Sequence, residues 1–285
     1  MWGVFLLIIS LSCGAPKALL SLKNDAETAT SQENYVQAVE LWKQYFNQQG
    51  FEDCEGLIIA QAAKTAYKSG DLDLALNWFD QARYKSYADA EMYATLAKIF
   101  KEKKNISKEL DALEFIEKNY SENLKEIDKR LFEVYFEINL PEKAVNVWER
   151  LDAESKNELV NLSHYLSLQI DLENSAVCDS VSLVLLEMEP QHQEALEWQA
   201  KKYYWLGENR YRSEMAKYEK KKTNKQYKIL LKELDKATAD FKKSLTYFNK
   251  LWKLESGEKY ASYFANIYAR FGDEKKSKFY QKYMK

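Results

Sequence analysis

The residue types that bind metals or serve as acid–base catalysts are few in this chain and lie far apart. His164 and His192 are its two histidines, and neither has a Cys, Asp or Glu at the spacing of metal ligands. The three cysteines, Cys13, Cys54 and Cys178, form neither a C-x-x-C pair nor a dense disulfide pattern. The sequence therefore predicts no metal site and no cofactor.

The sequence also lacks the short motifs that mark common enzymes. It has no G-x-S-x-G turn for a nucleophilic serine, no glycine-rich phosphate loop and no H-E-x-x-H zinc motif. Acidic residues recur close to basic ones, as in Glu149-Arg150, which is typical of solvated helix faces rather than of a catalytic carboxylate pair. We therefore predict that the chain is not an enzyme.

The composition favours a folded protein built from helices. Hydrophobic residues make up 46% of the chain and charged residues 30%, which is enough apolar material for a core. Only 8 Gly and 3 Pro occur, so the turn-forming residues that a β-sandwich needs are scarce. With 42 basic and 44 acidic residues, the charge balance argues against a broad electrostatic grip on nucleic acid or on an anionic membrane. Any partner must be recognised locally.

A pattern with a nearly constant period runs through most of the chain. A small anchor residue is followed four positions later by a large residue, and three positions later again by an apolar or small one. The first five anchors are separated by 37, 34, 35 and 34 residues. The members of the series are Ala38/Trp42/Tyr45, Ala75/Phe79/Ala82, Glu109/Leu113/Ile116, Ala144/Trp148/Leu151, Cys178/Ser182/Leu185, Ala237/Phe241/Ser244 and Ser277/Gln281/Met284. The pattern weakens in the middle, where Glu109 replaces a small anchor and Ser182 replaces a large residue.

This series resembles the tetratricopeptide repeat, whose units are about 34 residues long. The second unit carries the resemblance best, because its first helix, turn and second helix contain Ala62, Ala63 and Tyr67, then Gly70 and Asp71, then Ala75, Phe79 and Ala82. The resemblance implies an all-α, right-handed α-solenoid of tetratricopeptide-like helical hairpins over residues 13-285, each hairpin burying its apolar face against the next. The expected units are 18-50, 55-86, 89-120, 124-153, 157-190, an elongated 192-255 and 257-285.

The sixth unit predicts an elongated hairpin near the C-terminus. A series of positions between Gln226 and Leu254 steps by alternating fours and threes, the pattern of one long helix. The positions are Tyr227, Leu231, Leu234, Thr238, Phe241, Leu245, Phe248 and Trp252. A weaker stripe upstream passes through Gly207, and the polar stretch between the stripes predicts a turn near Thr223-Asn224. The alternative is that Gly207 ends the first helix and an extra short helix follows. The lysines of this turn are interpreted as a docking point for an acidic partner or phosphate-rich surface, or as a solvated turn.

Residues 1-12 are predicted to be a signal peptide. Their apolar run is too short to span a membrane but has the length of a signal-peptide core. It ends at Ser10-Leu11-Ser12-Cys13-Gly14, which resembles the lipobox of bacterial lipoproteins, where cleavage precedes a lipid-bearing cysteine. This resemblance implies an exported protein, lipidated on Cys13 and anchored to a membrane of the cell envelope, facing the periplasm or the cell surface. Ordinary secretion and a cytosolic location are the alternatives.

The tetratricopeptide resemblance also implies where a partner binds. In that family the first helices form the concave side, which commonly holds extended or helical segments of partners. The outward positions of these helices, which offer rings and cations, are Lys64, Tyr67, Lys68, Lys98, Lys101, Lys129, Phe136, Lys201, Tyr204 and Trp205. The clamp of Lys and Asn with which some relatives hold a C-terminal carboxylate is not reproduced.

We therefore predict a non-catalytic scaffold or adaptor in the bacterial cell envelope. Its partner would be a protein or peptide of unknown identity, with a membrane contacted through the N-terminal lipid and no nucleic acid. Capture of a polysaccharide or another small ligand on aromatic rings is the alternative function, and an enzyme is the third.

Overall fold

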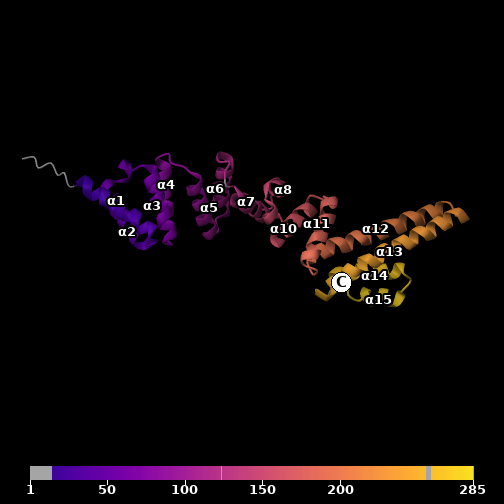
Figure 1. The fold of residues 1–285 in the computed structure, drawn as a ribbon. Helices are drawn as coiled ribbons and strands as arrows, with labels where there is room; N and C mark the ends of the chain where they lie inside the picture. The colour runs from indigo at the N-terminus through magenta and orange to yellow at the C-terminus, as the bar shows by residue number, and fades with distance from the viewer. Residues whose placement is uncertain (1–14, 123, 255–257, 285) are drawn as a thin grey trace, which may run out of the picture. The chain divides into compact units, whose positions relative to one another are not determined.

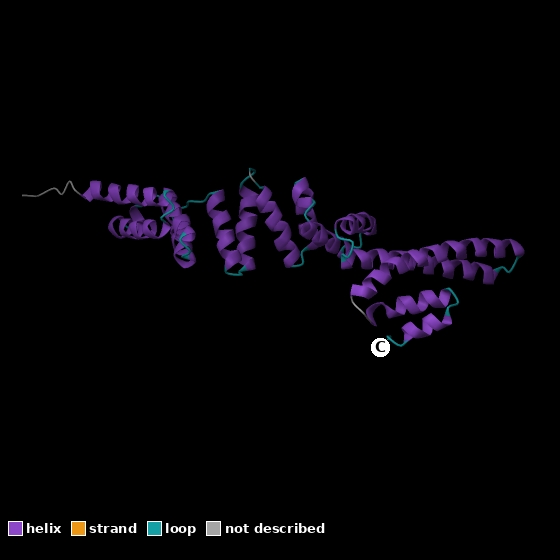
Figure 2. Cartoon of the chain, turned by 60° about the horizontal axis from the view of Figure 1, so that its bottom comes forward, coloured by secondary structure: helices purple, strands orange, loops and turns teal. Residues whose placement is uncertain are grey.

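The structure is a computed structural model, and it describes residues 15–122, 124–254 and 258–284. Throughout these ranges the chain is helical or lies in the turns and loops between helices (Figure 2). The predicted signal peptide, residues 1-12, and the predicted lipid site Cys13 lie outside the described residues, so both stay predictions.

The chain divides into two compact units, Met1–Val134 and Tyr135–Lys285, with the boundary inside helix α7 (Lys125–Glu137) (Figure 1). The first unit holds α1 (Ala15–Ser31), α2 (Tyr35–Gln49), the short 3-10 helix η1 (Phe51–Asp53), α3 (Gly56–Lys68), α4 (Leu72–Tyr84), α5 (Ala90–Glu102), α6 (Ile106–Asn119) and most of α7. The second holds α8 (Pro141–Arg150), α9 (Ala153–Lys156), α10 (Leu159–Asp171), α11 (Ser175–Met188), α12 (Gln193–Lys220), α13 (Asn224–Leu254), α14 (Glu258–Arg270) and α15 (Glu274–Gln281).

Consecutive helices pack in pairs, as the repeat pattern predicts. The pairs are α1 with α2, α3 with α4, α5 with α6, α10 with α11, α12 with α13, and α14 with α15. The predicted all-α fold of helical hairpins, with one elongated hairpin near the C-terminus, is therefore confirmed.

One backbone conformation recurs in the hairpin turns. Six of them contain a residue whose φ lies between 55° and 88°, and these residues are Glu33, Gly70, Lys104, Asn139, Glu173 and Gly272. Each lies five positions before an anchor of the sequence series, so the turns have the same period as the anchors. The left-handed residue follows the end of one helix, and the next residue is the N-cap of the following helix. At Asp71, the backbone N–H donates to the Ala66 carbonyl at 3.0 Å, while the side chain accepts from the Leu74 N–H at 3.0 Å.

The elongated hairpin of α12 and α13 is continuous through Gly207. The alternative in which this glycine ends the first helix is therefore wrong. A Cβ atom at Gly207 would lie 3.0 Å from the Phe241 ring and 3.1 Å from the Ala237 carbonyl, so a larger residue would require Phe241 or the α13 backbone to shift. At 31 residues, α13 is about 46 Å long at 1.5 Å per residue.

The buried seam of α13 agrees with the predicted one at Phe241, Leu245 and Phe248 but departs from it toward the N-terminal end of the helix. Its buried residues are Leu230, Ala237, Phe241, Ser244, Leu245, Phe248 and Leu251. The predicted Tyr227 and Leu231 are instead 47% and 45% exposed. The base of the hairpin packs against α14 around Tyr260 and Phe264. Toward the tip α12 alone covers α13, so Leu230 is buried there and its neighbours are not.

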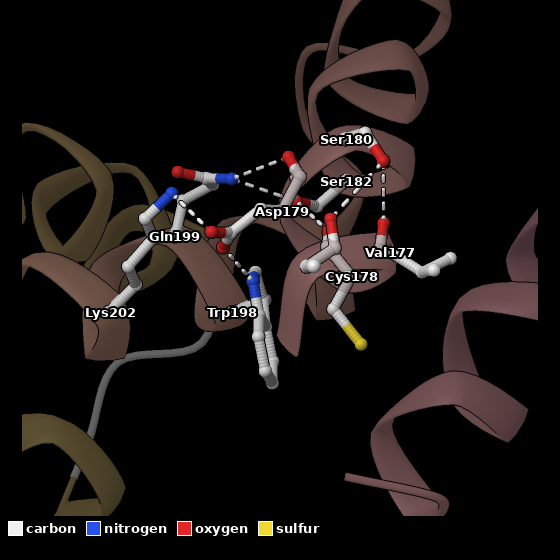
Figure 3. A network of polar contacts seen from close by, with 9 residues as sticks. Val177, Cys178, Asp179, Ser180, Ser182, Trp198, Gln199 and Lys202 are labelled. Atoms are coloured by element: carbon white, nitrogen blue, oxygen red, sulfur yellow. Dashed lines mark hydrogen bonds and ion pairs between the residues drawn. The ribbon is translucent and has the colours of Figure 1, made fainter. Parts of the chain in front are cut away.

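A polar network joins α11 to α12, at the position where Ser182 replaces a large repeat residue (Figure 3). The Gln199 side-chain amide donates to Ser182 Oγ at 2.8 Å, and both residues are fully buried. Trp198 Nε1 donates to Asp179 Oδ1 at 2.9 Å, and Lys202 Nζ lies 2.7 Å from Asp179 Oδ2. Hydrogen bonds thus replace ring packing at this seam and hold the elongated hairpin to α11.

Candidate functional site

Two cavities of the first unit are lined in part by predicted binding residues of the first helices. The larger, of about 780 Å³, lies among α5, α6 and α7 and is called the α5–α7 cavity here. The smaller, of about 360 Å³, lies among α1, α2 and α3 and is called the α1–α3 cavity. Glu91 of α5 lines both cavities, so they adjoin. Together they form the first-helix groove.

The α5–α7 cavity has small and apolar walls. Ala90, Ala94 and Ala97 line it along α5, and methyl side chains leave the space open. Leu113 and Ile116 of α6, each 2% exposed, form an apolar floor. The cavity can therefore take an apolar side chain of a ligand.

A buried ion pair closes one side of the α5–α7 cavity. Arg130 of α7 donates from Nε to Glu109 Oε1 at 2.6 Å and from Nη2 to Glu109 Oε2 at 3.2 Å, while Nη1 donates to Glu133 at 2.7 Å. The Glu109 side chain is 3% exposed and that of Arg130 17%. This pair explains why a carboxylate stands at a small anchor position. Sequence reasoning singled out Glu109 but missed Arg130, because the two are 21 residues apart and share no helix.

Two of the predicted binding residues, Lys98 and Lys101, line the α5–α7 cavity from α5. Both are exposed, and neither forms an ion pair with any residue in the described ranges. Glu122 and Glu126 line the same cavity, so its rim carries both signs of charge. The two lysines are nevertheless available to a carboxylate of a ligand, because no neighbouring acid occupies them.

Two further predicted residues, Lys64 and Lys68, line the α1–α3 cavity from α3. Lys64 Nζ lies 2.5 Å from Glu91 Oε2 and 4.0 Å from Asp89 Oδ2, so its charge is already balanced. Lys68 is exposed and lies over the Tyr35 ring, 5.5 Å from its centroid. The ion pair between Lys64 and Glu91 therefore lies where the two cavities adjoin.

The other two predicted residues of the first unit, Tyr67 and Lys129, lie on α3 and α7. The Tyr67 hydroxyl donates to Glu102 Oε1 of α5 at 3.0 Å. Burial and this hydrogen bond raise the pKa of Tyr67, since both disfavour the phenolate. Lys129 is half-buried. Neither residue is among those that line the two cavities.

Of the four predicted residues of the second unit, Phe136 lies on α7, whereas Lys201, Tyr204 and Trp205 lie on α12. Phe136 stacks on His164, with ring centroids 3.9 Å apart, so this histidine serves packing. Tyr204 is 6% exposed and lies in the core of the elongated hairpin, whereas its neighbour Trp205 is 47% exposed. Lys201 is half-buried and paired with Glu197 at 2.5 Å.

A third cavity, of about 450 Å³, lies in the second unit and is lined by Lys201, Lys259 and two glutamates of α12. Burial raises the pKa of Glu194, and nearby Asp171 adds to this. Burial acts in the same direction on Glu197, but hydrogen bonds from Lys201, Lys259 and Tyr260 lower its pKa below the usual value. With both oxygens of Glu197 occupied by these donors, its carboxylate ties α12 to α14.

The remaining reactive residue types have structural contacts. His192 is the N-cap of α12: its Nδ1 accepts from the Ala195 N–H at 3.3 Å, and its Nε2 lies 2.8 Å from Ser163 Oγ. Cys54 and Cys178 are buried free thiols, and burial raises the pKa of Cys178 to about 11. Over the described ranges, no group of His, Cys, Asp and Glu residues is placed to hold a metal ion. Within the same ranges, no helix has the length and apolar character needed to cross a membrane.

No protein-family model and no curated protein matches the chain. Among solved structures, a Bacteroides ovatus protein described as protein-binding is 14% identical, covers 77% of this chain and 100% of its own, and has a TM-score of 0.52. YrrB, a tetratricopeptide repeat protein with an unusual peptide-binding site, is 13% identical over 65% of this chain and 96% of its own, with a TM-score of 0.49. A tetratricopeptide repeat protein from Parabacteroides merdae is 12% identical over 93% of this chain and 91% of its own, with a TM-score of 0.48. The paired helices and their periodic turns assign the chain to the α-helical repeat fold of tetratricopeptide proteins.

Proposed function

We propose that the chain is a non-catalytic scaffold or adaptor, and that its first-helix groove binds a segment of a partner protein. The observation that carries this proposal is the α5–α7 cavity, which combines an apolar floor with two unpaired lysines on its rim. Apolar space with a few placed polar groups is the usual composition of a ligand site.

The cavity favours one kind of segment. Its floor of Leu113 and Ile116 would take an apolar side chain, and its volume of about 780 Å³ suits several residues rather than one. Lys98 and Lys101 would pair with an acidic residue of the same segment. A partner segment with an apolar anchor next to Asp or Glu fits this arrangement.

Two further considerations support a binding role. The Bacteroides ovatus protein with the similar fold is described as protein-binding. The carboxylates Glu109 and Glu197 are each held by two or more hydrogen bonds to cations or hydroxyls, so neither is free to abstract a proton. We also propose export to the cell envelope with a lipid on Cys13, on the strength of the N-terminal sequence.

A site-specific crosslinking experiment tests the groove. A photoreactive amino acid replaces Ala94, which lines the α5–α7 cavity, and a control chain carries it at Lys108, which lines a different cavity among α4, α5 and α6. The partner segment captured through position 94 is then synthesised, and its affinity is measured by calorimetry. Lys98→Glu is expected to weaken binding by about 2 kcal/mol, which is the scale of one charge-assisted hydrogen bond.

The matched variant Lys108→Glu makes the same charge change on the other side of α5 and α6 and is expected to leave the affinity unchanged. Equal affinities of the Lys98→Glu and Lys108→Glu variants would show that the segment does not bind in the groove. Preferential capture of polysaccharide from the envelope, with no protein crosslinked at position 94, would favour the carbohydrate alternative.

A further inference from the structure

The tip of the elongated hairpin, residues 217–232, is strongly basic. It contains seven lysines and one glutamate, a formal charge of +6, although the whole chain has a net charge of -2. All seven lysines are exposed. Lys217 is paired with Glu214, but the other six have no ion pair with any described residue. A strongly positive segment therefore lies at one end of one hairpin, in a chain whose net charge is slightly negative.

The hairpin tip lies beyond the helices that cover the base of the hairpin. The core shared with α14 and α15 includes Leu196, Ala200, Ala237 and Phe241 but no residue of the tip. Arg270 of α14 reaches as far as the Tyr211 ring, at 4.1 Å from its centroid. In both views the far ends of α12 and α13 extend past α14 and α15 (Figure 1 and Figure 2).

The hairpin tip also exposes large apolar side chains among its lysines. Tyr227 is 47% exposed, Ile229 41% and Leu231 45%, although Leu230 between them is 4% exposed. At about 100° per residue, Ile229 and Leu231 lie on opposite sides of the seam that Leu230 forms with α12. A flat protein partner could cover one of these sides. A medium that surrounds the end of the hairpin could cover both.

We propose that the hairpin tip binds the surface of an anionic lipid bilayer. Lysines would lie among the phosphate headgroups, while the exposed tyrosine, isoleucine and leucine enter the boundary between headgroups and acyl chains. The even charge balance of the whole chain argues against broad electrostatic attraction to a membrane. A local cluster of lysines at the hairpin tip is consistent with that balance. The proposal is independent of the first-helix groove, which lies in the other unit.

Vesicle flotation of the full chain tests the proposal. Vesicles of phosphatidylcholine alone are compared with vesicles that also contain phosphatidylglycerol, and binding is expected only to the latter and to fall as salt is added. Each basic residue near an anionic surface contributes about a factor of five, so the triple variant Lys220→Gln/Lys221→Gln/Lys222→Gln is expected to bind about a hundredfold more weakly. The double variant Tyr227→Ser/Leu231→Ser is expected to lose the binding that persists at high salt.

The matched control is Lys242→Gln/Lys250→Gln/Lys253→Gln, which removes three exposed lysines of α13 outside the tip of the same hairpin. Binding through the apolar N-terminal residues would be the same in both triple variants, so equal binding by the two would overturn the proposal. The proposal would also be overturned if the wild-type protein bound vesicles equally with and without phosphatidylglycerol. Binding to polyglutamate or nucleic acid, but not to vesicles, would overturn it as well. Circular dichroism of each variant establishes that the helices are retained.

Discussion

Glu109→Ala is the most informative perturbation of the first unit, because it restores the small residue that the repeat pattern favours. It nevertheless removes the two hydrogen bonds, at 2.6 and 3.2 Å, that the Arg130 guanidinium donates to the carboxylate. Sequence consensus predicts that the change stabilises the protein. The buried ion pair predicts that it destabilises α6 and α7.

The expected magnitude follows from burial. Removing one partner of a buried ion pair typically costs about 3–5 kcal/mol, since the other charge stays in a poorly solvated place. The Arg130 side chain is 17% exposed and keeps its 2.7 Å contact with Glu133. We therefore expect a loss near the lower limit, about 3 kcal/mol.

Native-state hydrogen exchange is the suitable assay, because repeat arrays open locally and do not unfold in a single step. A loss of about 3 kcal/mol corresponds to roughly hundredfold faster exchange of the α6 amides, such as those of Leu113 and Ile116. Amides of α14, in the second unit, provide the internal control and are expected to exchange at their wild-type rates.

A double-mutant cycle decides whether the pair is the cause. Arg130→Met alone leaves the carboxylate of Glu109 buried and unpaired, so it is also expected to be costly. The double variant Glu109→Ala/Arg130→Met removes both charges of the pair and is expected to lose at least 2 kcal/mol less than the sum of the two single losses, about the scale of such couplings. Additive losses, or a stabilised Glu109→Ala, would refute the reasoning.

Three further outcomes concern the second unit. Gly207→Ala forces a Cβ into a 3.0 Å contact and is expected to cost about 1–3 kcal/mol, seen as a lower midpoint of thermal unfolding by circular dichroism. Ser182→Ala leaves the buried Gln199 amide without its 2.8 Å acceptor and is expected to cost about 1–2 kcal/mol in urea unfolding. Burial acts to raise the pKa of Glu208, but hydrogen bonds from two arginines lower it, so its stabilisation is present above the unfolded-state pKa and is lost as pH falls through the folded-state value. Glu208→Gln is therefore expected to flatten the fall of the urea midpoint in acid.

The hairpins could be predicted from the sequence because two independent local signals agree. Apolar periodicity indicates the helices, and Gly70-Asp71 and Gly272-Asp273 indicate the turns. The equivalent turn at Lys104-Asn105 is harder to recognise, since lysine rarely adopts a left-handed conformation. Its position became evident only from the period. The short helix α9, which lies between the repeats, has no such period and was not predicted.

The candidate site could be predicted only in part, because exposure depends on contacts between distant residues. Lys98 and Lys101 line the α5–α7 cavity, as outward positions of a first helix should. Tyr204 occupies a similar position on α12, but its ring meets Tyr263 of α14 at 4.8 Å and is buried. No local sequence pattern shows which later helix packs over an earlier one. For the same reason the partner of Glu109 could not be read from the sequence.

The left-handed turn residues are also positions at which a substitution can change the stability of a single hairpin. At Glu33, Lys104 and Glu173 a side chain occupies a conformation that glycine adopts freely, and each carries on the order of 1 kcal/mol of steric strain. Because each repeat interacts mainly with its neighbours, relief at one turn strengthens one hairpin and leaves distant ones as they were. Single substitutions at these evenly spaced positions could therefore adjust the rigidity of individual segments during evolution without altering any surface that a ligand contacts.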